Sequence, residues 1–255
     1  MKVLRTFYRA IRKGFSLFFE ILSAVWDYKN NVWGKGLHHN YKAKASWLQK
    51  WSQRVLKALN ISYSCAGIPP KNGMLASTHV SYLDILVIAA NIPTIFVAKQ
   101  QVRSWPLIGW ITSLAGTLYV SREHRGDVKR VTNEFLPILE EGIIAVVFPE
   151  GTSTNSHEVR PFFSSLLEPC VKLQMPVTGA WIGYKVSFPY TIEKDVCFWG
   201  DMGFVPHILR LLCTTQVESK LIFGKSIQGV SNRKQVACDL REDIIKIAKR
   251  EGAIS

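Results

Sequence analysis

The chain of 255 residues lacks a long uninterrupted apolar run. Its longest strongly apolar N-terminal stretch, residues 14–26, contains Glu20 and is shorter than the roughly twenty residues that a membrane-spanning helix needs. A secretory signal peptide is disfavoured as well, because Glu20 interrupts the apolar stretch and no Ala-x-Ala-like cleavage site follows it. No internal repeat or low-complexity segment is visible either.

Cysteine is scarce and scattered. The five cysteines lie far apart in the sequence, and no two of them form a Cys-x-x-Cys pair. An odd, dispersed set excludes both a disulfide framework and a zinc site built on cysteines. We therefore interpret these cysteines as small core residues of a protein in a reducing compartment.

Acidic residues are almost absent from the first 60 positions. This segment holds twelve Lys and Arg against two acids, so ten of the thirteen net positive charges lie there. The remainder of the chain is nearly neutral, which is not the distribution of a uniformly basic nucleic-acid-binding protein. We therefore expect an anionic partner, but no nucleic acid.

Residues 1–62 are predicted to form a basic, apolar membrane-docking segment with two helices, over 2–26 and 41–59. In the second helix, Trp47 and Trp51 belong to one apolar stripe with basic residues largely off it. Tryptophan together with basic residues on an amphipathic helix is typical of the bilayer interface. The alternative is an ordinary helix docked on the core, and the sequence leaves open whether 2–26 lies on a membrane or enters it.

Residues 63–255 are predicted to form a second unit, which contains the candidate catalytic residues described below. Hydrophobic residues make up 47% of the chain, enough for a large core. Short apolar runs alternate with helical stretches, which indicates an α/β fold with a mixed sheet flanked by helices. The expected strands are Met74–Ser77, Thr94–Ala98, Thr117–Ser121, Ile143–Phe148, Val177–Ile182, Val196–Trp199 and Val217–Phe223. The expected helices are Leu83–Asn91, Leu107–Leu114, Gly126–Glu141, Ser164–Leu173, Phe204–Cys213 and Asn232–Arg250.

An imidazole and a carboxylate stand five residues apart in His79-Val-Ser-Tyr-Leu-Asp84. His79 follows an expected strand and Asp84 falls in the first turn of the next helix, where ligands bind in α/β sheets. A histidine there can take a proton from an alcohol, and a carboxylate on its other nitrogen fixes the tautomer. The alternative is a structural histidine at a strand end. Because no Gly-x-Ser-x-Gly elbow is present, we expect direct attack by an acceptor hydroxyl.

A second candidate segment is Phe148-Pro-Glu-Gly-Thr152, which ends the apolar run before it abruptly. Gly151 lets the backbone come close to a ligand and Thr152 supplies a hydroxyl. Glu150 can accept hydrogen bonds from the hydroxyls of an acceptor or pair with a cation. The alternative is a plain turn with an exposed carboxylate.

Three basic residues lie between these two segments. Lys99 and Arg122 directly follow expected strands, and Arg103 begins a proline- and glycine-marked segment before an expected helix. Arginines directly after strands can fork onto phosphate oxygens. Charged residues also occur at such places simply because the chain reaches water there.

Four segments together carry a resemblance: His79-Val-Ser-Tyr-Leu-Asp84, Arg122 after Leu118-Tyr-Val-Ser, Phe148-Pro-Glu-Gly-Thr152 and Met175-Pro-Val177. In order and spacing, the chain resembles the glycerolipid acyltransferase family, whose best-known branch is the 1-acylglycerol-3-phosphate acyltransferases. The resemblance spans about residues 65–200, and the basic two-helix N-terminus is similar to the membrane-docking segment of bacterial members.

The resemblance implies transfer of a fatty acyl group from acyl-CoA or acyl-carrier protein to a lysolipid hydroxyl, most often making phosphatidic acid. It implies His79 as general base, Asp84 as its orienting partner, Arg122 as a phosphate ligand and Glu150–Thr152 as part of the acceptor site. It further implies that no metal or cofactor is bound, and that the enzyme works on an anionic lipid surface at the cytoplasmic face of a bacterial inner membrane.

The chain departs from the family pattern at places that bear on the acceptor. Thr78 replaces the usual Asn before the histidine, and Ser153 replaces a usual Arg among the expected acceptor-binding residues. With Trp199-Gly-Asp-Met202, the second departure resembles the branch that acylates lyso-ornithine lipids, whose acceptor lacks a phosphate. A lyso-ornithine lipid O-acyltransferase is thus one alternative, and a catalytically inactive membrane lipid-binding protein is another.

Overall fold

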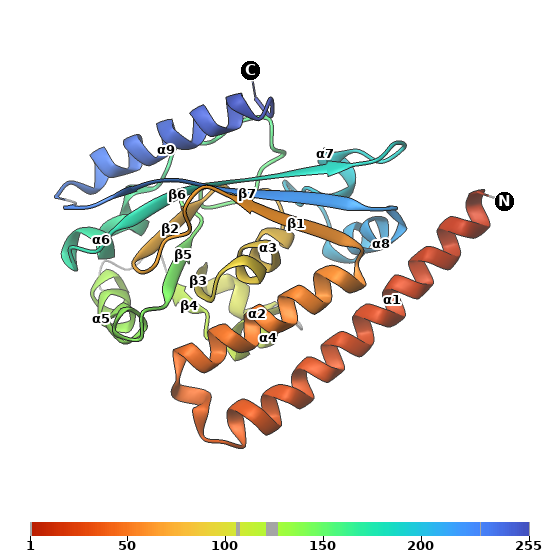
Figure 1. Cartoon of the computed structure of the whole chain (residues 1–255), viewed down its shortest axis with the longest axis horizontal. Helices are drawn as coiled ribbons and strands as arrows, with labels where there is room; N and C mark the ends of the chain where they lie inside the picture. Colours follow the sequence, from red (N-terminus) through yellow and green to blue (C-terminus); the bar gives the residue numbers. More distant parts are fainter. Residues whose placement is uncertain (1, 106–107, 121–126, 230, 255) are drawn as a thin grey trace.

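The computed structural model describes residues 2–105, 108–120, 127–229 and 231–254. Its centre is one seven-stranded mixed sheet in the order β1-β7-β6-β2-β5-β3-β4 (Figure 1). This confirms the predicted fold class. The strands are β1 (Ile61–Ala66), β2 (Met74–Ser77), β3 (Thr94–Lys99), β4 (Leu118–Val120), β5 (Ile144–Val147), β6 (Val177–Val186) and β7 (Val217–Ile227).

The direction of the strands decides where the site lies. Strands β6, β2, β5, β3 and β4 run parallel, whereas β7 is antiparallel to β6 and β1 is parallel to β7. The central strands β2 and β5 are buried along their whole length, as expected of parallel strands covered on both faces. The segments that follow β2, β5 and β3 therefore leave the sheet next to one another.

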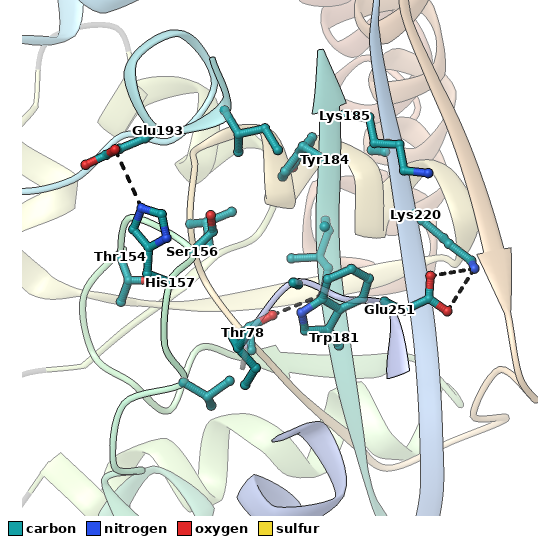
Figure 2. A pocket seen from close by; sticks show the side chains of 18 of the residues that line it. Thr78, Thr154, Ser156, His157, Trp181, Tyr184, Lys185, Glu193, Lys220 and Glu251 are labelled. Atoms are coloured by element: carbon teal, nitrogen blue, oxygen red, sulfur yellow. Dashed lines mark hydrogen bonds and ion pairs between the residues drawn. The ribbon is translucent and has the colours of Figure 1, made fainter. Parts of the chain in front are cut away.

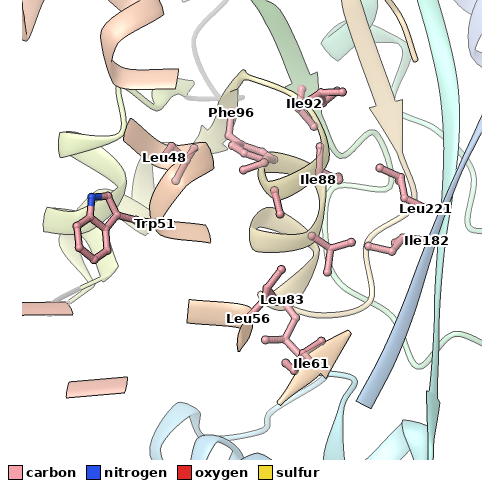
Figure 3. Packing of buried hydrophobic residues seen from close by; sticks show 14 of the residues in the cluster. Leu48, Trp51, Leu56, Ile61, Leu83, Ile88, Ile92, Phe96, Ile182 and Leu221 are labelled. Carbon is pink, nitrogen blue, oxygen red and sulfur yellow. The ribbon is translucent and has the colours of Figure 1, made fainter. Parts of the chain in front are cut away.

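One face of the sheet is covered by α3 (Leu83–Asn91), with α2 (Tyr41–Ala58) outside it. Figure 3 shows the packing between these helices and the sheet, in which Leu56 and Leu83 lie with Ile182 of β6 and Leu221 of β7. These side chains are at most 1% exposed, so burying each one stabilises the fold by about 1.5 to 3 kcal/mol.

The other face carries α9 (Arg233–Arg250), α5 (Asp127–Glu140) and α6 (Glu168–Lys172) (Figure 1). Leu240 of α9 packs in a second buried cluster with Met74 and Val177 of the sheet. Asn232 starts α9, because its side chain accepts hydrogen bonds from the second and third backbone N–H groups after it.

Helix α1 (Lys2–Asp27) lies on the outside of the molecule, against α2 and α8 (Phe204–Cys213) (Figure 1). The indole of Trp47 donates to the carbonyl of Ala24 at 3.1 Å, and Arg54 pairs with Glu20 at 2.6 Å. Glu20, which interrupts the apolar sequence, thus serves the contact with α2. Among the described residues, none of the helices combines the length and the apolarity that a bilayer crossing demands.

The prediction that tryptophans of the second helix face a membrane is wrong. Trp47 and Trp51 are 6% and 5% exposed, because α1 packs over the stripe to which they belong. The indole of Trp51 donates to Asp27 of α1 at 2.8 Å. The exposed apolar side chains of the N-terminal segment lie mainly on α1 instead.

Three other details differ from the sequence-based expectation. Val196–Trp199 is not a strand: the segment follows the short helix α7 (Ile192–Asp195), and its first two residues bond back to a carbonyl of that helix. β1 was not predicted, and the domain boundary placed after residue 62 falls inside it; the division into two units stays a prediction. The expected helix over 164–173 is a 3-10 turn (Ser164–Leu167) followed by α6.

The remaining short elements are the π-helical turn Tyr28–Trp33, the 3-10 turns Leu37–His39 and Gln100–Ser104, and α4 (Ile108–Leu114).

Candidate active site

The structure brings His79 and Asp84 together. His79 follows β2, and Asp84 lies in the first turn of α3, so a tight connection returns the carboxylate to the imidazole. Nδ1 of His79 and Oδ2 of Asp84 are 2.8 Å apart. The side chain of His79 is 20% exposed and that of Asp84 is fully buried. The histidine therefore has a fixed ring with Nε2 left as its second hydrogen-bonding nitrogen.

Asp84 is held by four donors. Besides His79, its Oδ2 accepts the backbone N–H groups of Val80 at 2.7 Å and Ser81 at 2.9 Å. Its Oδ1 accepts the hydroxyl of Tyr184 at 2.6 Å. A buried carboxylate needs this many partners, because an unpaired charge in the interior is costly.

The imidazole of His79 also lies flat on an aromatic ring. Its centroid is 4.0 Å from that of Phe148, with an interplanar angle of 17°, and Phe148 stacks in turn on Phe96. The ring is thus fixed by a stacked face and one nitrogen, which restricts rotation of the side chain.

Glu150 is buried next to the backbone of His79, whereas the sequence predicted that it faces an acceptor. It is 3% exposed, and its two carboxylate oxygens accept the backbone N–H groups of His79 at 3.1 Å and Arg160 at 2.9 Å. Burial raises the pKa of Glu150 to about 7, although these two hydrogen bonds act in the opposite direction. The carboxylate ties the loop after β5 to the segment after β2.

The residues that follow Glu150, residues 151–154, contact different parts of the site. Gly151 has a φ of +72°, a backbone conformation that favours glycine, and Thr152 beside it is exposed. The hydroxyl of Ser153 donates to the carbonyl of Phe198. The backbone N–H of Thr154 donates to the carbonyl of His79 at 2.9 Å, which fastens the turn to the histidine segment a second time.

Two of the three basic residues predicted to hold phosphate lie in the described part of the chain. Lys99 ends β3, and Arg103 lies in the 3-10 turn that follows, with its guanidinium 5.7 Å from the ring centroid of Tyr119. Both therefore belong to the segment that leaves the sheet next to β5. Arg122 lies outside the described residues.

Sequence reasoning missed a segment that contacts the connection between β2 and α3. The backbone N–H of Phe198 donates to the carbonyl of Val80 at 2.8 Å, directly beside the histidine. The ring of Phe198 packs with Tyr82, Phe204 and His207. The apolar run that contains Phe198 was interpreted as a strand, so the only usable signal was its aromatic content.

A cavity of about 570 Å³ adjoins the site (Figure 2). Thr78 and Glu150 line it together with Trp181, whose ring occupies the place that a side chain on Gly183 would need. The hydroxyl oxygen of Thr78 accepts the backbone N–H of Ile182 at 3.0 Å. Thr78 is thereby engaged in holding β2 against β6.

No three His, Cys, Asp or Glu side chains gather as a metal ion would require, within residues 2–105, 108–120, 127–229 and 231–254. All five cysteines are free thiols. The expectation that the protein binds no metal or cofactor stays a prediction.

Comparisons with known proteins identify a family and a fold that this chain resembles. Residues 63–183 match a family model described as Acyltransferase. The lyso-ornithine lipid O-acyltransferase of Pseudomonas aeruginosa is 32% identical over 163 residues, which cover 64% of this chain and 62% of that protein. The chain thus spans less than two thirds of the length of this relative.

A second relative carries a different name. The 1-acyl-sn-glycerol-3-phosphate acyltransferase of Neisseria gonorrhoeae is 31% identical over 172 residues, with 66% of this chain and 67% of that protein covered. Among solved structures, the 1-acyl-sn-glycerophosphate acyltransferase PlsC of Thermotoga maritima matches with a TM-score of 0.68 and 18% identity, covering 98% of each chain. The last comparison shows a shared fold.

Proposed function

Since this chain belongs to the glycerolipid acyltransferase family, we propose that it transfers a fatty acyl group from a thioester donor to the hydroxyl of a lysolipid. The observation that carries the proposal is the contact of 2.8 Å between His79 and a fully buried Asp84. A neutral imidazole in this setting presents Nε2 as a base, with its tautomer fixed by the carboxylate.

The proposed reaction proceeds without a covalent enzyme intermediate. Nε2 of His79 accepts the proton of the lysolipid hydroxyl while that oxygen attacks the thioester carbonyl. The new C–O bond becomes the ester, the C–S bond breaks, and the thiol of CoA or acyl-carrier protein leaves with the proton that His79 returns. Asp84 stabilises the imidazolium during this exchange, and no metal or bound cofactor takes part.

We test the proposal with labelled acyl-CoA and acyl-carrier protein, each offered with a lysolipid. His79→Ala removes the base and is expected to lower kcat by roughly 10²- to 10⁴-fold. His39→Ala is the matched control, because His39 is exposed in the N-terminal connection and makes no contact with Asp84. Equal turnover by wild type and His79→Ala would show that His79 is not the general base.

The acceptor is proposed in two forms. Lys99 and Arg103, at the end of β3, support an acceptor with a phosphate, namely 1-acyl-sn-glycerol-3-phosphate. Ser153 supports a lyso-ornithine lipid, because its hydroxyl bonds to Phe198 and offers no positive charge to a phosphate. The names of the relatives include both activities.

An acceptor panel separates the two forms. Lysophosphatidic acid and lyso-ornithine lipid are compared under one acyl donor by kcat/KM. A preference of 100-fold corresponds to about 2.7 kcal/mol of differential transition-state binding, and would name the acceptor. No transfer to either lipid, together with retained binding to vesicles, would favour an inactive lipid-binding protein.

We further propose that the substrates are met at a membrane surface through α1. Apolar side chains recur every three or four residues along its exposed side and are 42% to 74% exposed. Because acyl-CoA and acyl-carrier protein are cytoplasmic donors, we place the enzyme at the cytoplasmic face of a bacterial inner membrane. The side chains that form this apolar stripe are Leu4, Tyr8, Ile11, Phe15, Phe18, Leu22 and Trp26.

A further inference from the structure

The two oxygens of the Asp84 carboxylate bind partners from different parts of the fold. Its Oδ2 faces His79 and two backbone N–H groups of its own connection, so these partners move with the loop between β2 and α3. Its Oδ1 faces the hydroxyl of Tyr184, which is 100 residues away in sequence, at 2.6 Å. This second contact links the carboxylate to a different part of the fold.

Tyr184 stands on a rigid support. It lies in β6, where it is paired with Ser219 of β7, and its side chain points to the same side of the sheet as Ile182. It is 6% exposed and belongs to the buried cluster beneath α3. Because its backbone is fixed by ladder hydrogen bonds, its hydroxyl offers Asp84 a donor at a set position.

The hydroxyl stays a donor at neutral pH. Burial and the nearby charge of Asp84 raise the pKa of Tyr184 well above its ordinary value. The bond therefore has a neutral O–H donating to a carboxylate, which is the stronger, charge-assisted kind of hydrogen bond.

We propose that Tyr184 is a positioning residue of the reaction: its hydroxyl fixes the Asp84 carboxylate so that Oδ2 holds Nδ1 of His79. The inference rests on the proposed function, since it assigns a task within the same site. Without the hydroxyl, Oδ1 loses its partner and the carboxylate can turn about its terminal bond. The O–H dipole also offsets part of the negative charge that His79 experiences.

The test is Tyr184→Phe, which keeps the ring and removes the hydroxyl. Loss of a hydrogen bond to a charged group is expected to lower kcat roughly ten- to a hundredfold, with KM little changed. The acid limb of the plot of kcat/KM against pH is expected to move to higher pH, because the imidazolium faces a less compensated carboxylate. Tyr190→Phe is the matched control, since it deletes a 2.6 Å bond from a tyrosine hydroxyl to the carbonyl of Cys213, away from the site.

Two additional readouts separate positioning from a merely structural role. In an Asp84→Asn background, Tyr184→Phe is expected to have no further effect on kcat, because the two side chains act as a unit. Incorporation of 3-fluorotyrosine at position 184, which makes the hydroxyl a stronger donor, is expected to move the acid limb in the opposite direction. Thermal unfolding checks that each variant is folded.

The outcomes are decisive. If Tyr184→Phe matches Tyr190→Phe in kcat and in its pH profile, or if its effect adds fully to that of Asp84→Asn, the inference is overturned. If wild type transfers no acyl group to any lysolipid, the proposed function fails, and the inference is then read from the Nδ1–H proton resonance of His79. A resonance that does not move in Tyr184→Phe overturns it; a shift absent from Tyr190→Phe supports it.

Discussion

Glu150 is a buried carboxyl group beside His79, and burial shifts its protonation. The pKa of Glu150 is raised from 4.5 to about 7, so between these values the folded state holds more protons than the unfolded state. Its contribution to stability is complete below about pH 4.5 and is lost as the pH rises through 7. The free energy of unfolding is expected to fall by on the order of 2 to 3 kcal/mol across this window from this group.

The measurement compares denaturant unfolding of wild type and Glu150→Gln at about pH 5 and about pH 8. The variant carries a constant cost, because its amide NH₂ faces one of two backbone N–H donors, but it lacks the titration. The stability difference between wild type and variant should therefore shrink at the higher pH. Glu218→Gln, at an exposed position of β7, is the control, and an unchanged pH dependence in Glu150→Gln would contradict the prediction.

Thr78 is expected to contribute to stability rather than to proton transfer. It is 4% exposed, and its hydroxyl oxygen accepts the N–H of Ile182 at 3.0 Å. Thr78→Val keeps the shape but leaves that donor unpaired, which costs about 1 to 3 kcal/mol of unfolding free energy. Urea unfolding should register this loss, while kcat of the folded variant stays within a few-fold of wild type; a large fall in kcat with unchanged stability would show a direct role.

The sequence predicted the centre of the site better than its surroundings. The spacing of His79 and Asp84 across a strand end and a helix start led to the observed contact. Tyr184 and Phe198 were missed because they reach the site through sheet pairing and a loop, and no local pattern encodes such partners. Glu150 was expected to face an acceptor, yet its burial depends on where the chain beyond it turns back.

At the scale of elements, the apolar stripe of α1 carries the proposed membrane contact. Replacing Phe15 and Phe18 by Ser removes two side chains that are 63% and 55% exposed, so folding should be little affected. Binding to lipid vesicles is expected to weaken by roughly tenfold or more for each phenylalanine, at about 1.5 kcal/mol each. Ile68→Ser, which removes an 82% exposed side chain after β1, is the control. If vesicle sedimentation shows the same affinity for all of these variants, the apolar stripe of α1 is not the membrane contact.

The same helix is fastened to the body by a buried lysine. Lys13 is 1% exposed and donates to the backbone carbonyl of Thr214 at 3.0 Å, and burial lowers the pKa of Lys13 from 10.5 to about 8. The folded state therefore holds fewer protons between pH 8 and 10.5, so stability from this group rises with pH through that window.

Unfolding of Lys13→Met tests this attachment. Between pH 7.5 and pH 10, the free energy of unfolding of wild type should rise by about 1 to 2 kcal/mol relative to that of the variant. This is less than the whole pKa shift would give, because the carbonyl of Thr214 favours the charged amine. Lys57→Met, at an exposed position of α2, is expected to show no such pH dependence. If the free energy of unfolding depends on pH in the same way for wild type and Lys13→Met, the amine of Lys13 is solvated and the prediction is wrong.

At the scale of the whole molecule, alternation of strands and helices was enough to predict a mixed α/β sheet. It did not predict that β1 joins the far edge of the sheet beside β7, because that pairing connects residues 61–66 with 217–222. It also placed the tryptophans of α2 at a membrane. An amphipathic helix has one apolar face in either case, and the local sequence does not show that α1 and α3 cover this one.

The distribution of charge over the molecule supplies the last prediction. Ten of the thirteen net charges lie in residues 1–60, the segment that also bears the exposed apolar stripe. Each basic residue near an anionic leaflet contributes about 1 kcal/mol, and salt screens this attraction. Binding to vesicles that contain phosphatidylglycerol should therefore weaken steeply as salt is added. Binding to phosphatidylcholine vesicles should be weaker and almost independent of salt, because there only the apolar stripe acts.

Charge-reducing variants make the test specific. Arg5→Gln with Arg12→Gln removes two exposed charges of α1, and should reduce both the affinity for anionic vesicles and its dependence on salt. Lys225→Gln with Lys234→Gln removes two charges from the body and is the matched control. If both pairs change vesicle binding equally, then net charge alone governs binding. If binding to DNA proves tighter than binding to anionic vesicles at the same salt, the expectation of a lipid partner for this basic segment fails, because a lipid-docking segment must prefer a surface that also accepts its apolar side chains.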